Sequence, residues 1–146
     1  ELSKSTLADE TILIGSDCLI MITTFYASLL AILLVMLSMR VIGVRGNPMF
    51  RVLSFKTAGD QTLERVIRAH GNLTEYAPLM LILMFLAEND GASAFTIHAY
   101  GASFLLGRVM HAWCFAMTAK SVPLRVGGTA ITLTAVLGLA IKLLVS

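Results

Sequence analysis

The sequence predicts an all-α integral membrane protein, folded as a single domain that forms a bundle of four transmembrane helices. Of its 146 residues, 57% are hydrophobic and only 14% are charged, whereas soluble domains are usually about a quarter charged. The apolar residues gather into runs of about 20, the length that a helix needs to cross a bilayer. In lipid, backbone polar groups must be paired internally, which favours helices. The net charge of +2 is too small to indicate nucleic-acid binding.

Four spans are expected, at about residues 18–39, 62–87, 92–119 and 124–145. The first has no charged residue and the third contains only Arg108. The fourth contains Lys142 close enough to its end for the side chain to reach the interface. The second is free of charge only over residues 76–87. It therefore becomes a full span only if the polar stretch before it continues the same helix.

The basic residues are divided unevenly between the two ends of these spans. One end carries Arg40, Arg45, Arg51, Lys56, Arg65, Arg68, Lys120 and Arg125, and the other carries only Lys4 and Lys142. The positive-inside rule therefore places the loops 40–61 and 120–125 in the cytoplasm and both termini on the opposite side. The first of these loops is interpreted as a basic surface loop, with a lid as the alternative.

A polar segment, RVIRAHGNLTEYAP, begins the second span at residues 65–78. At about 100° per residue, five polar side chains fall within about a quarter of the helix circumference. This polar stripe consists of Glu64, Arg65, Arg68, Asn72 and Glu75. His70 falls on the far side of the helix, so we expect it to have a packing role. A charge at the bilayer centre costs about 2.5 to 3.5 kcal/mol, so the stripe must face protein, water or a polar ligand.

The third span offers a partner for this stripe, because Arg108, His111 and Phe115 share one face of that helix. At 1.5 Å per residue, Asn72, Glu75 and Arg108 lie within about one helical turn of the same depth. We therefore expect these three residues to meet in one layer, with Arg68 nearer the cytoplasmic edge.

Such a layer would suit a small zwitterion with excess carboxylate. It offers cations at Arg68, Arg108 and Arg125, an anion at Glu75 and an amide at Asn72. Arginine binds carboxylates through two parallel hydrogen bonds, and an apolar reactant could arrive from the bilayer. Two structural alternatives stay open. The start of the stripe could be a solvated first turn, and the rest could be a salt-bridge network that joins helices.

The residues Glu64-Arg65-x-x-Arg68-Ala69-His70-x-Asn72-x-x-Glu75-x-x-Pro78 resemble the MAPEG family, the membrane-associated proteins of eicosanoid and glutathione metabolism. Gly107-Arg108-Val109-x-His111 and Pro123-x-Arg125 are similar to the prostaglandin E synthase branch. The resemblance covers about residues 20 to 145. The motif in the second span is long and specific, and the other two are weaker.

The resemblance implies a homotrimer of four-helix subunits with glutathione, a co-substrate, bound between neighbouring subunits near the cytoplasmic face. Arg68, Asn72, Glu75 and Arg108 match positions that bind glutathione. Arg125 matches the arginine that stabilises the thiolate, which makes it the candidate catalytic residue. The implied function is a membrane-embedded glutathione-dependent transferase or peroxidase that acts on a lipophilic electrophile.

Two departures from the family pattern remove polar contacts. Gly71 stands where a synthase-like member has a further arginine, and Phe115 stands where such members carry a tyrosine that contacts glutathione. Because the family also contains a member that binds lipid without catalysis, a non-catalytic lipid-binding or scaffold protein is the first alternative. A small transporter is the second, although neither broken helices nor internal repeats are visible.

Neither the histidines nor the cysteines indicate a further site. His70, His98 and His111 lack the spacing of metal ligands, so no metal site is expected. Cys18 and Cys114 fall near opposite membrane faces, too far apart for a disulfide, and are expected to be apolar packing residues.

Overall fold

The computed structural model describes residues 2–118 and 121–145, with side chains from Ile22 onward. Its elements are α1 (Leu2–Val44), η1 (Pro48–Leu53), η2 (Gly59–Gln61), α2 (Thr62–Asn89), α3 (Ala94–Ala116) and α4 (Val122–Val145), where η marks a short 3₁₀ helix. The described residues contain no strand, which confirms the all-α class.

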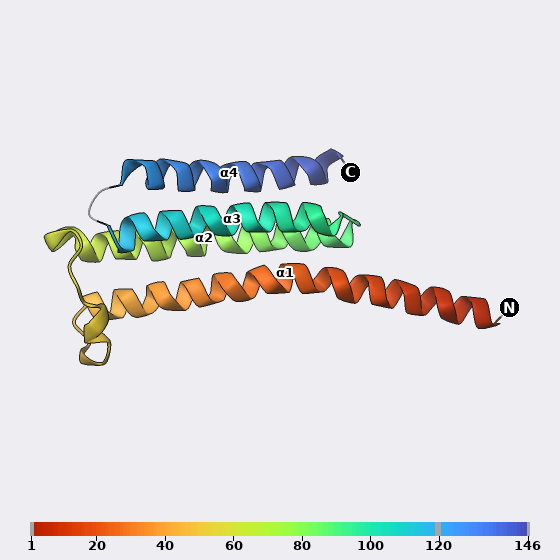
Figure 1. Ribbon diagram of the computed structural model, residues 1–146, viewed down its shortest axis with the longest axis horizontal. Coiled ribbons are helices and arrows are strands. Elements are labelled where there is room, and N and C mark those ends of the chain that lie inside the picture. Colours follow the sequence, from red (N-terminus) through yellow and green to blue (C-terminus); the bar gives the residue numbers. More distant parts are fainter. Residues whose placement is uncertain (1, 119–120, 146) are drawn as a thin grey trace.

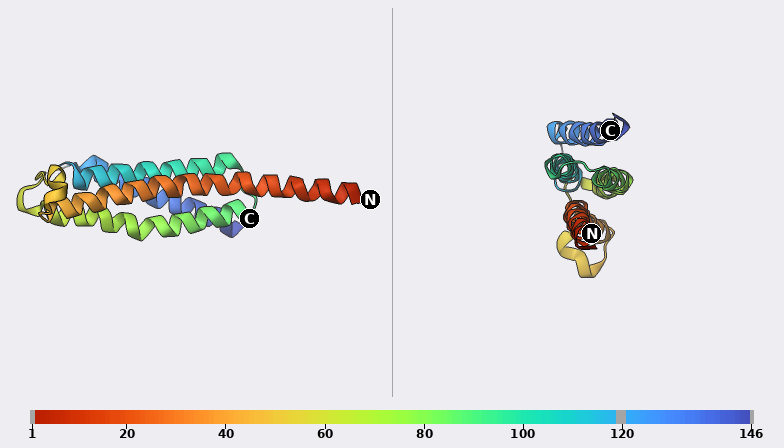
Figure 2. Two further views of the ribbon diagram at one scale, coloured as in Figure 1. Left: turned by 90° about the horizontal axis from the view of Figure 1, so that it is seen from below. Right: turned by 90° about the vertical axis from the view of Figure 1, so that its right-hand side faces the viewer.

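The four long helices lie side by side and alternate in direction (Figure 1). Both ends of the chain lie at one end of the bundle, and the loop between α1 and α2 lies at the other. Viewed along the helices, α2 and α3 form a middle layer between α1 and α4 (Figure 2). The N-terminal part of α1 extends past the ends of the other helices.

The helix α1 is longer at both ends than the predicted span at residues 18–39, because it runs from Leu2 to Val44. The prediction stopped before the charge of Arg40, but that side chain is only 2% exposed. Its guanidinium donates to the carbonyl oxygens of Leu53 and Phe55, the latter at 2.6 Å, and to that of Ala116 at 3.4 Å. The charge is thus solvated by backbone oxygens inside the protein, and the helix continues beyond it.

The other three helices begin and end within a few residues of the predicted spans. Two described segments are long and apolar enough to cross a membrane: Ile22–Val44, with a mean hydropathy of 2.3, and Val122–Val145, with 1.9. The middle helices are less apolar because α2 carries the polar stripe and α3 carries Arg108 and two histidines. The polar middle layer therefore lies between two more apolar helices.

One face of α2 forms part of the core of the bundle. Its buried side chains recur every three or four residues: Val66, Ala69, Leu73, Met80 and Met84. At 100° per residue this face lies opposite Glu64, Arg68 and Glu75, which are exposed. These three members of the stripe thus point away from the subunit's own core.

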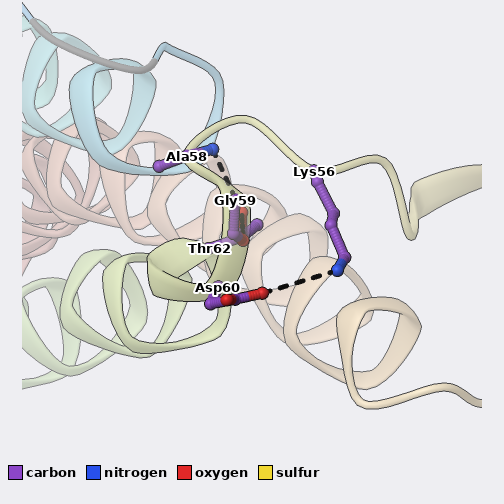
Figure 3. A network of polar contacts seen from close by, with 5 residues as sticks. All are labelled: Lys56, Ala58, Gly59, Asp60 and Thr62. Atoms are coloured by element: carbon purple, nitrogen blue, oxygen red, sulfur yellow. Dashed lines mark hydrogen bonds and ion pairs between the residues drawn. The ribbon is translucent and has the colours of Figure 1, made fainter.

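The start of α2 is fixed by local hydrogen bonds (Figure 3). The backbone N–H of Ala58 donates to Thr62 Oγ1 at 3.1 Å, and that hydroxyl donates to the Gly59 oxygen at 2.7 Å. At the other end of the helix, the predicted span ended before Glu88, but this residue is still helical and is 4% exposed. Its Oε1 accepts from the backbone N–H of Thr23 at 3.1 Å, which ties α2 to α1.

The helices α3 and α4 approach closely at two glycines. A Cβ atom on Gly107 would lie 2.6 Å from Thr132 Oγ1, and one on Gly128 would lie 2.8 Å from the Gly107 oxygen. Small residues at such a crossing let helix backbones come together. This contact sets the height at which α4 meets the polar residues of α3.

Candidate functional site

The side chain of Arg108 connects three helices at the centre of the bundle. It is 3% exposed, and its Nε and Nη2 donate to Thr132 Oγ1 on α4 at 3.0 and 2.6 Å. Its Nη1 donates to the side-chain oxygen of Asn72 on α2, and to the backbone oxygen of the same residue at 3.3 Å. Of the three residues expected to meet in one layer, the structure thus brings Asn72 and Arg108 into contact, whereas Glu75 lies with Asn72 in the lining of the neighbouring cavity.

No carboxylate of the described chain neutralises this buried guanidinium. The ion pairs among the described residues are Lys56–Asp60 and Arg68–Glu64. The remaining neighbours of Arg108 are the rings of Tyr76 and Phe104, with centroids 5.2 and 5.7 Å from Cζ. Neutral acceptors and ring faces solvate a cation only in part, so the site has an excess of positive charge.

A cavity of about 420 Å³ opens beside this cluster, between α2 and α3. The residues that line this polar cavity are Ile67, Arg68, Gly71, Asn72, Glu75, His111 and Phe115. Three members of the polar stripe therefore share one cavity with two residues of the third span. Arg108 lies behind Asn72 rather than in the lining, so it acts on the cavity through that amide and through its charge.

The first turns of the stripe make contacts that are mostly structural. Arg68 pairs with Glu64 at 2.7 Å, but both side chains are 64% exposed, and exposed pairs contribute little to stability. Arg65 donates to the oxygens of Cys114 and Thr118 at 2.8 and 2.9 Å. It therefore satisfies carbonyls at the end of α3, a common role for a basic residue at a helix C-terminus.

On α3, the aromatic side of the cavity is an ordered stack. The rings of His111 and Phe115 lie 4.7 Å apart with an angle of 27° between their planes. The guanidinium of Arg65 lies 5.3 Å from the centre of the Phe115 ring. Phe115 is thus held between a histidine and a cation, in the lining of the polar cavity.

His70 lies outside the polar cavity and contacts α1. Its Nε2 lies 3.0 Å from Ser38 Oγ, and that hydroxyl donates to the Leu34 oxygen at 2.8 Å. Because the serine hydrogen is used in this way, His70 Nε2 is the donor. The residue therefore joins two helices, on the side of α2 that the periodicity indicated.

Arg125 is not brought to the lining of the polar cavity. It lies at the start of α4 with an exposed side chain. Cys114 is a buried free cysteine whose Sγ donates to the Ser121 oxygen at 3.1 Å. The side chain of Cys18 and the residue Lys120 lie outside the described residues.

Two residues of the cluster were missed by the sequence analysis. Thr132 was missed because a hydroxyl in an apolar helix carries little signal by itself, although Gly128 four residues earlier marks the same face of α4. Tyr76 was counted only as the first residue of an apolar run. Both lie beside Arg108 because of how the helices pack.

The chain is similar to known membrane proteins. The sequence model described as "MAPEG family" matches residues 23–145, which include the three motifs quoted above, the C-terminal half of α1 and the helices α2, α3 and α4. The chain belongs to the MAPEG family. The match confirms the resemblance seen in the sequence and establishes the protein as a membrane protein.

Two curated relatives of this MAPEG protein have the same printed name. They are "Inner membrane protein YecN" of Escherichia coli strain K12 and the protein of that name from Escherichia coli O6:H1. Each is 37% identical to this chain over 95 residues, which is 65% of this chain and 70% of the relative. No solved structure matches the chain significantly.

Proposed function

We propose that this MAPEG protein is a glutathione-dependent transferase or peroxidase that acts on a lipophilic electrophile. We further propose that it works as a homotrimer whose four helices all cross the membrane. The observation that carries the proposal is the buried guanidinium of Arg108 beside a polar cavity, with no carboxylate partner among the described residues. A buried charge without a partner is costly, and an anionic ligand in the cavity would offset that cost.

The residues around the cavity complement glutathione group by group. Glutathione carries two carboxylates and one ammonium group, so it needs more cations than anions. Glu75 would bind the ammonium group, and Arg68 would bind a carboxylate. Arg108 would hold the Asn72 amide in place and supply positive charge to the cavity from outside its lining. Ile67 and Phe115 provide apolar contact for the tripeptide chain.

The proposed chemistry needs a thiolate rather than a protein nucleophile. Free thiols titrate near 8.5, and a neighbouring cation lowers that pKa. With Arg125 beside the sulfur, glutathione would lose its thiol proton to solvent. In the transferase reaction, the thiolate then forms a carbon–sulfur bond with the electrophile while the bond to the leaving group breaks and that group takes the electron pair. Holding both reactants in one site supplies the orientation.

The homotrimer is proposed because the exposed part of the stripe needs a partner. Glu75 and Arg68 lie on the face of α2 that points away from the subunit's core, and charges on such a face avoid lipid. A neighbouring subunit would cover this face, and its Arg125 would complete the site. Native mass measurement in mild detergent should show three copies. A monomer that still binds glutathione would exclude a site between subunits.

The binding proposal is tested by calorimetry with glutathione in detergent. Wild-type protein should bind, and Glu75→Gln should weaken binding about tenfold or more, because a hydrogen bond to a charged group contributes about 1.5 to 3 kcal/mol. The matched control is Asp60→Asn, which alters an exposed acid outside the cavity. If both variants bind like the wild type, Glu75 has no part in the site.

The catalytic step is tested through the ultraviolet absorbance of the thiolate, titrated against pH. Arg125→Ala should leave most of the affinity for glutathione and raise the thiol pKa of the bound molecule. Lys142→Ala removes a cation at the other end of α4 and should leave that pKa unchanged. Absence of a thiolate band at neutral pH in the wild type would rule out the catalytic reading.

The proposed orientation places loops 40–61 and 120–125 in the cytoplasm. Its support is the charge bias of the two ends together with the position of both termini opposite the α1–α2 loop (Figure 1). A reporter enzyme fused after Ser146 should therefore be exported. Activity of a cytoplasmic reporter at that position would reverse the orientation.

A lipid-binding scaffold is the second candidate, and a separate cavity favours it. The helices α1 and α3 enclose about 450 Å³ lined almost entirely by apolar side chains, with Arg40 and Leu53 at its loop end. A scaffold would retain lipid through purification but show no thiolate band and no conjugate. A transporter, the third reading, would move solute across vesicles without forming a conjugate.

A further inference from the structure

The segment at residues 45–56, called the strap here, is a fixed structure rather than a loose loop. The side chain of Asn47 accepts from the Met49 N–H at 3.0 Å and so caps η1. Ser54 Oγ donates to the Arg51 oxygen at 2.6 Å, which closes the other end. The strap also packs tightly on α1, because a Cβ atom on Gly43 would lie 2.7 Å from the Phe50 oxygen.

Arg40 holds the inner side of the strap. Its guanidinium donates to the oxygens of Leu53 and Phe55 and lies 3.7 Å from the centre of the Phe55 ring. A buried guanidinium bound to two carbonyls and an aromatic face leaves the strap little freedom to turn over. Its outer side is therefore fixed as well.

That outer side presents large apolar side chains. Met49 is 81% exposed and Val52 is 85% exposed. They lie in the segment Pro48–Leu53, which is kinked at Phe50 between them, and their exposure makes them the open apolar part of the strap. Exposing both to water would forgo about 1.5 to 3 kcal/mol for each side chain relative to full burial. Because the strap is fixed, it cannot rearrange to bury these two side chains against the rest of the protein.

Basic residues flank Met49 and Val52 in the sequence, which has no acid between residues 40 and 59. Arg45 and Arg51 are exposed and form no ion pair with a described residue. Lys56 lies 3.8 Å from Asp60 (Figure 3), but both side chains are fully open to solvent or nearly so. The strap thus combines an apolar face with unneutralised positive charge.

We propose that the strap docks on the surface of the bilayer that contains the protein and binds anionic phospholipid headgroups. Met49 and Val52 enter the boundary between headgroups and acyl chains, and Arg45 and Arg51 bind lipid phosphates. Apolar residues next to arginine and lysine are typical of interfacial segments, and anionic lipid attracts each basic residue near the surface. The proposal rests on the proposed crossing of the membrane by the helices of the bundle and does not depend on glutathione binding.

The position of the strap also favours lipid over a soluble partner. In Figure 1 the strap projects sideways from the end of α1, across the direction of the helices. In a bundle whose helices cross the bilayer, a segment with this direction lies along the bilayer surface. A soluble protein would have to compete with lipid that is already present beside the strap.

The experiment places a tryptophan reporter on the strap. Val52→Trp is made in a Trp113→Phe background, which removes the only natural tryptophan, and the full chain is reconstituted in lipid nanodiscs. Lipids brominated near the headgroup should quench the reporter strongly in discs containing phosphatidylglycerol and weakly in discs of phosphatidylcholine alone. Met49→Trp, at the other strongly exposed apolar residue of the strap, is the second reporter, in case the first variant does not fold.

Charge dependence is measured separately, by native mass spectrometry of retained phosphatidylglycerol. Arg45→Gln and Arg51→Gln should each weaken the retention of phosphatidylglycerol by about fivefold. The matched control is Lys142→Gln, which also removes one positive charge. It should not weaken the quenching of the tryptophan reporter on the strap. Tryptophan reporters that emit as in water would overturn the docking proposal. So would reporters that emit as buried residues but are not quenched by brominated lipid in either type of disc. Equal quenching in the two lipid compositions, or phosphatidylglycerol retention that Arg45→Gln and Arg51→Gln leave unchanged, would overturn the recognition of anionic headgroups.

Discussion

Arg108 of α3 and Thr132 of α4 share two hydrogen bonds to one hydroxyl oxygen, at 3.0 and 2.6 Å. The same hydroxyl donates to the Gly128 oxygen at 2.8 Å. Thr132 is fully buried, so it acts as a fixed acceptor for a buried cation. The arrangement joins the last helix of the bundle to the residues that we propose bind glutathione.

Thr132→Val should destabilise the protein by about 1.5 to 3 kcal/mol, because it removes the acceptor from a charged donor while keeping the shape of the side chain. Glutathione affinity should also fall, since Arg108 would hold Asn72 less firmly. Thermal unfolding in detergent and calorimetry measure the two effects. Thr129→Val is the matched control, because that hydroxyl bonds to the Arg125 carbonyl of its own helix. Equal melting of the two variants would contradict the assigned role.

Gly128→Ala should destabilise the protein by about 1 to 3 kcal/mol through overpacking. Its added Cβ would meet two backbone atoms, the Gly107 oxygen at 2.8 Å and the His111 nitrogen at 3.0 Å. Gly127→Ala should be neutral or stabilising, because its Cβ would meet only the flexible end of Met110 at 3.3 Å and alanine favours the helix. If the two neighbouring glycines tolerate alanine equally well in thermal unfolding, the close crossing of α3 and α4 is wrong.

His70→Gln should lower stability more than it lowers glutathione affinity. The hydrogen bond between His70 and Ser38 joins α2 to α1, and a typical bond of this kind contributes about 0.5 to 1.5 kcal/mol. Ser38→Ala should cost a similar amount, and the double variant should cost less than the sum of the two, since both remove one interaction. Loss of binding with unchanged melting would place His70 in the site.

Gly71→Arg should strengthen glutathione binding by about tenfold, because it adds a cation to the lining of the polar cavity and a charged hydrogen bond contributes at least about 1.5 kcal/mol. A Cβ atom at this position meets nothing within 4 Å, so the longer side chain has room to enter. Gly71→Gln supplies a neutral side chain as the control. Calorimetry that shows the same affinity for both variants would argue against a carboxylate at this end of the cavity.

Phe115→Tyr should increase the turnover of a lipophilic electrophile, because the added hydroxyl lies in the cavity lining beside His111. The substitution keeps the ring and its stack, so melting should be unchanged. Conjugate formation with a reactive aromatic halide measures the effect. Turnover that stays at the uncatalysed rate in the wild type and in this variant would favour the scaffold reading.

The sequence by itself determined the helices and the direction of their polar faces. Helical periodicity separates His70 from Arg68, Asn72 and Glu75, and it does so without any knowledge of the neighbouring helices. The long motif of the second span identified the family for the same reason, since all its residues lie on one continuous helix. Patterns of this kind depend only on the geometry of a single helix, so the sequence is enough to predict them.

Only the tertiary structure decided which helices supply the partners of those faces. Periodicity fixes how a side chain points from its own helix, but not how far two helices slide or rotate against each other. That offset is set by the close contact of Gly107 with Gly128, which brings Thr132 to Arg108. The predicted spans ended before Arg40 and Glu88, yet both residues are helical and buried, because backbone groups of other segments solvate their charges. Their burial depends on packing between distant parts of the chain.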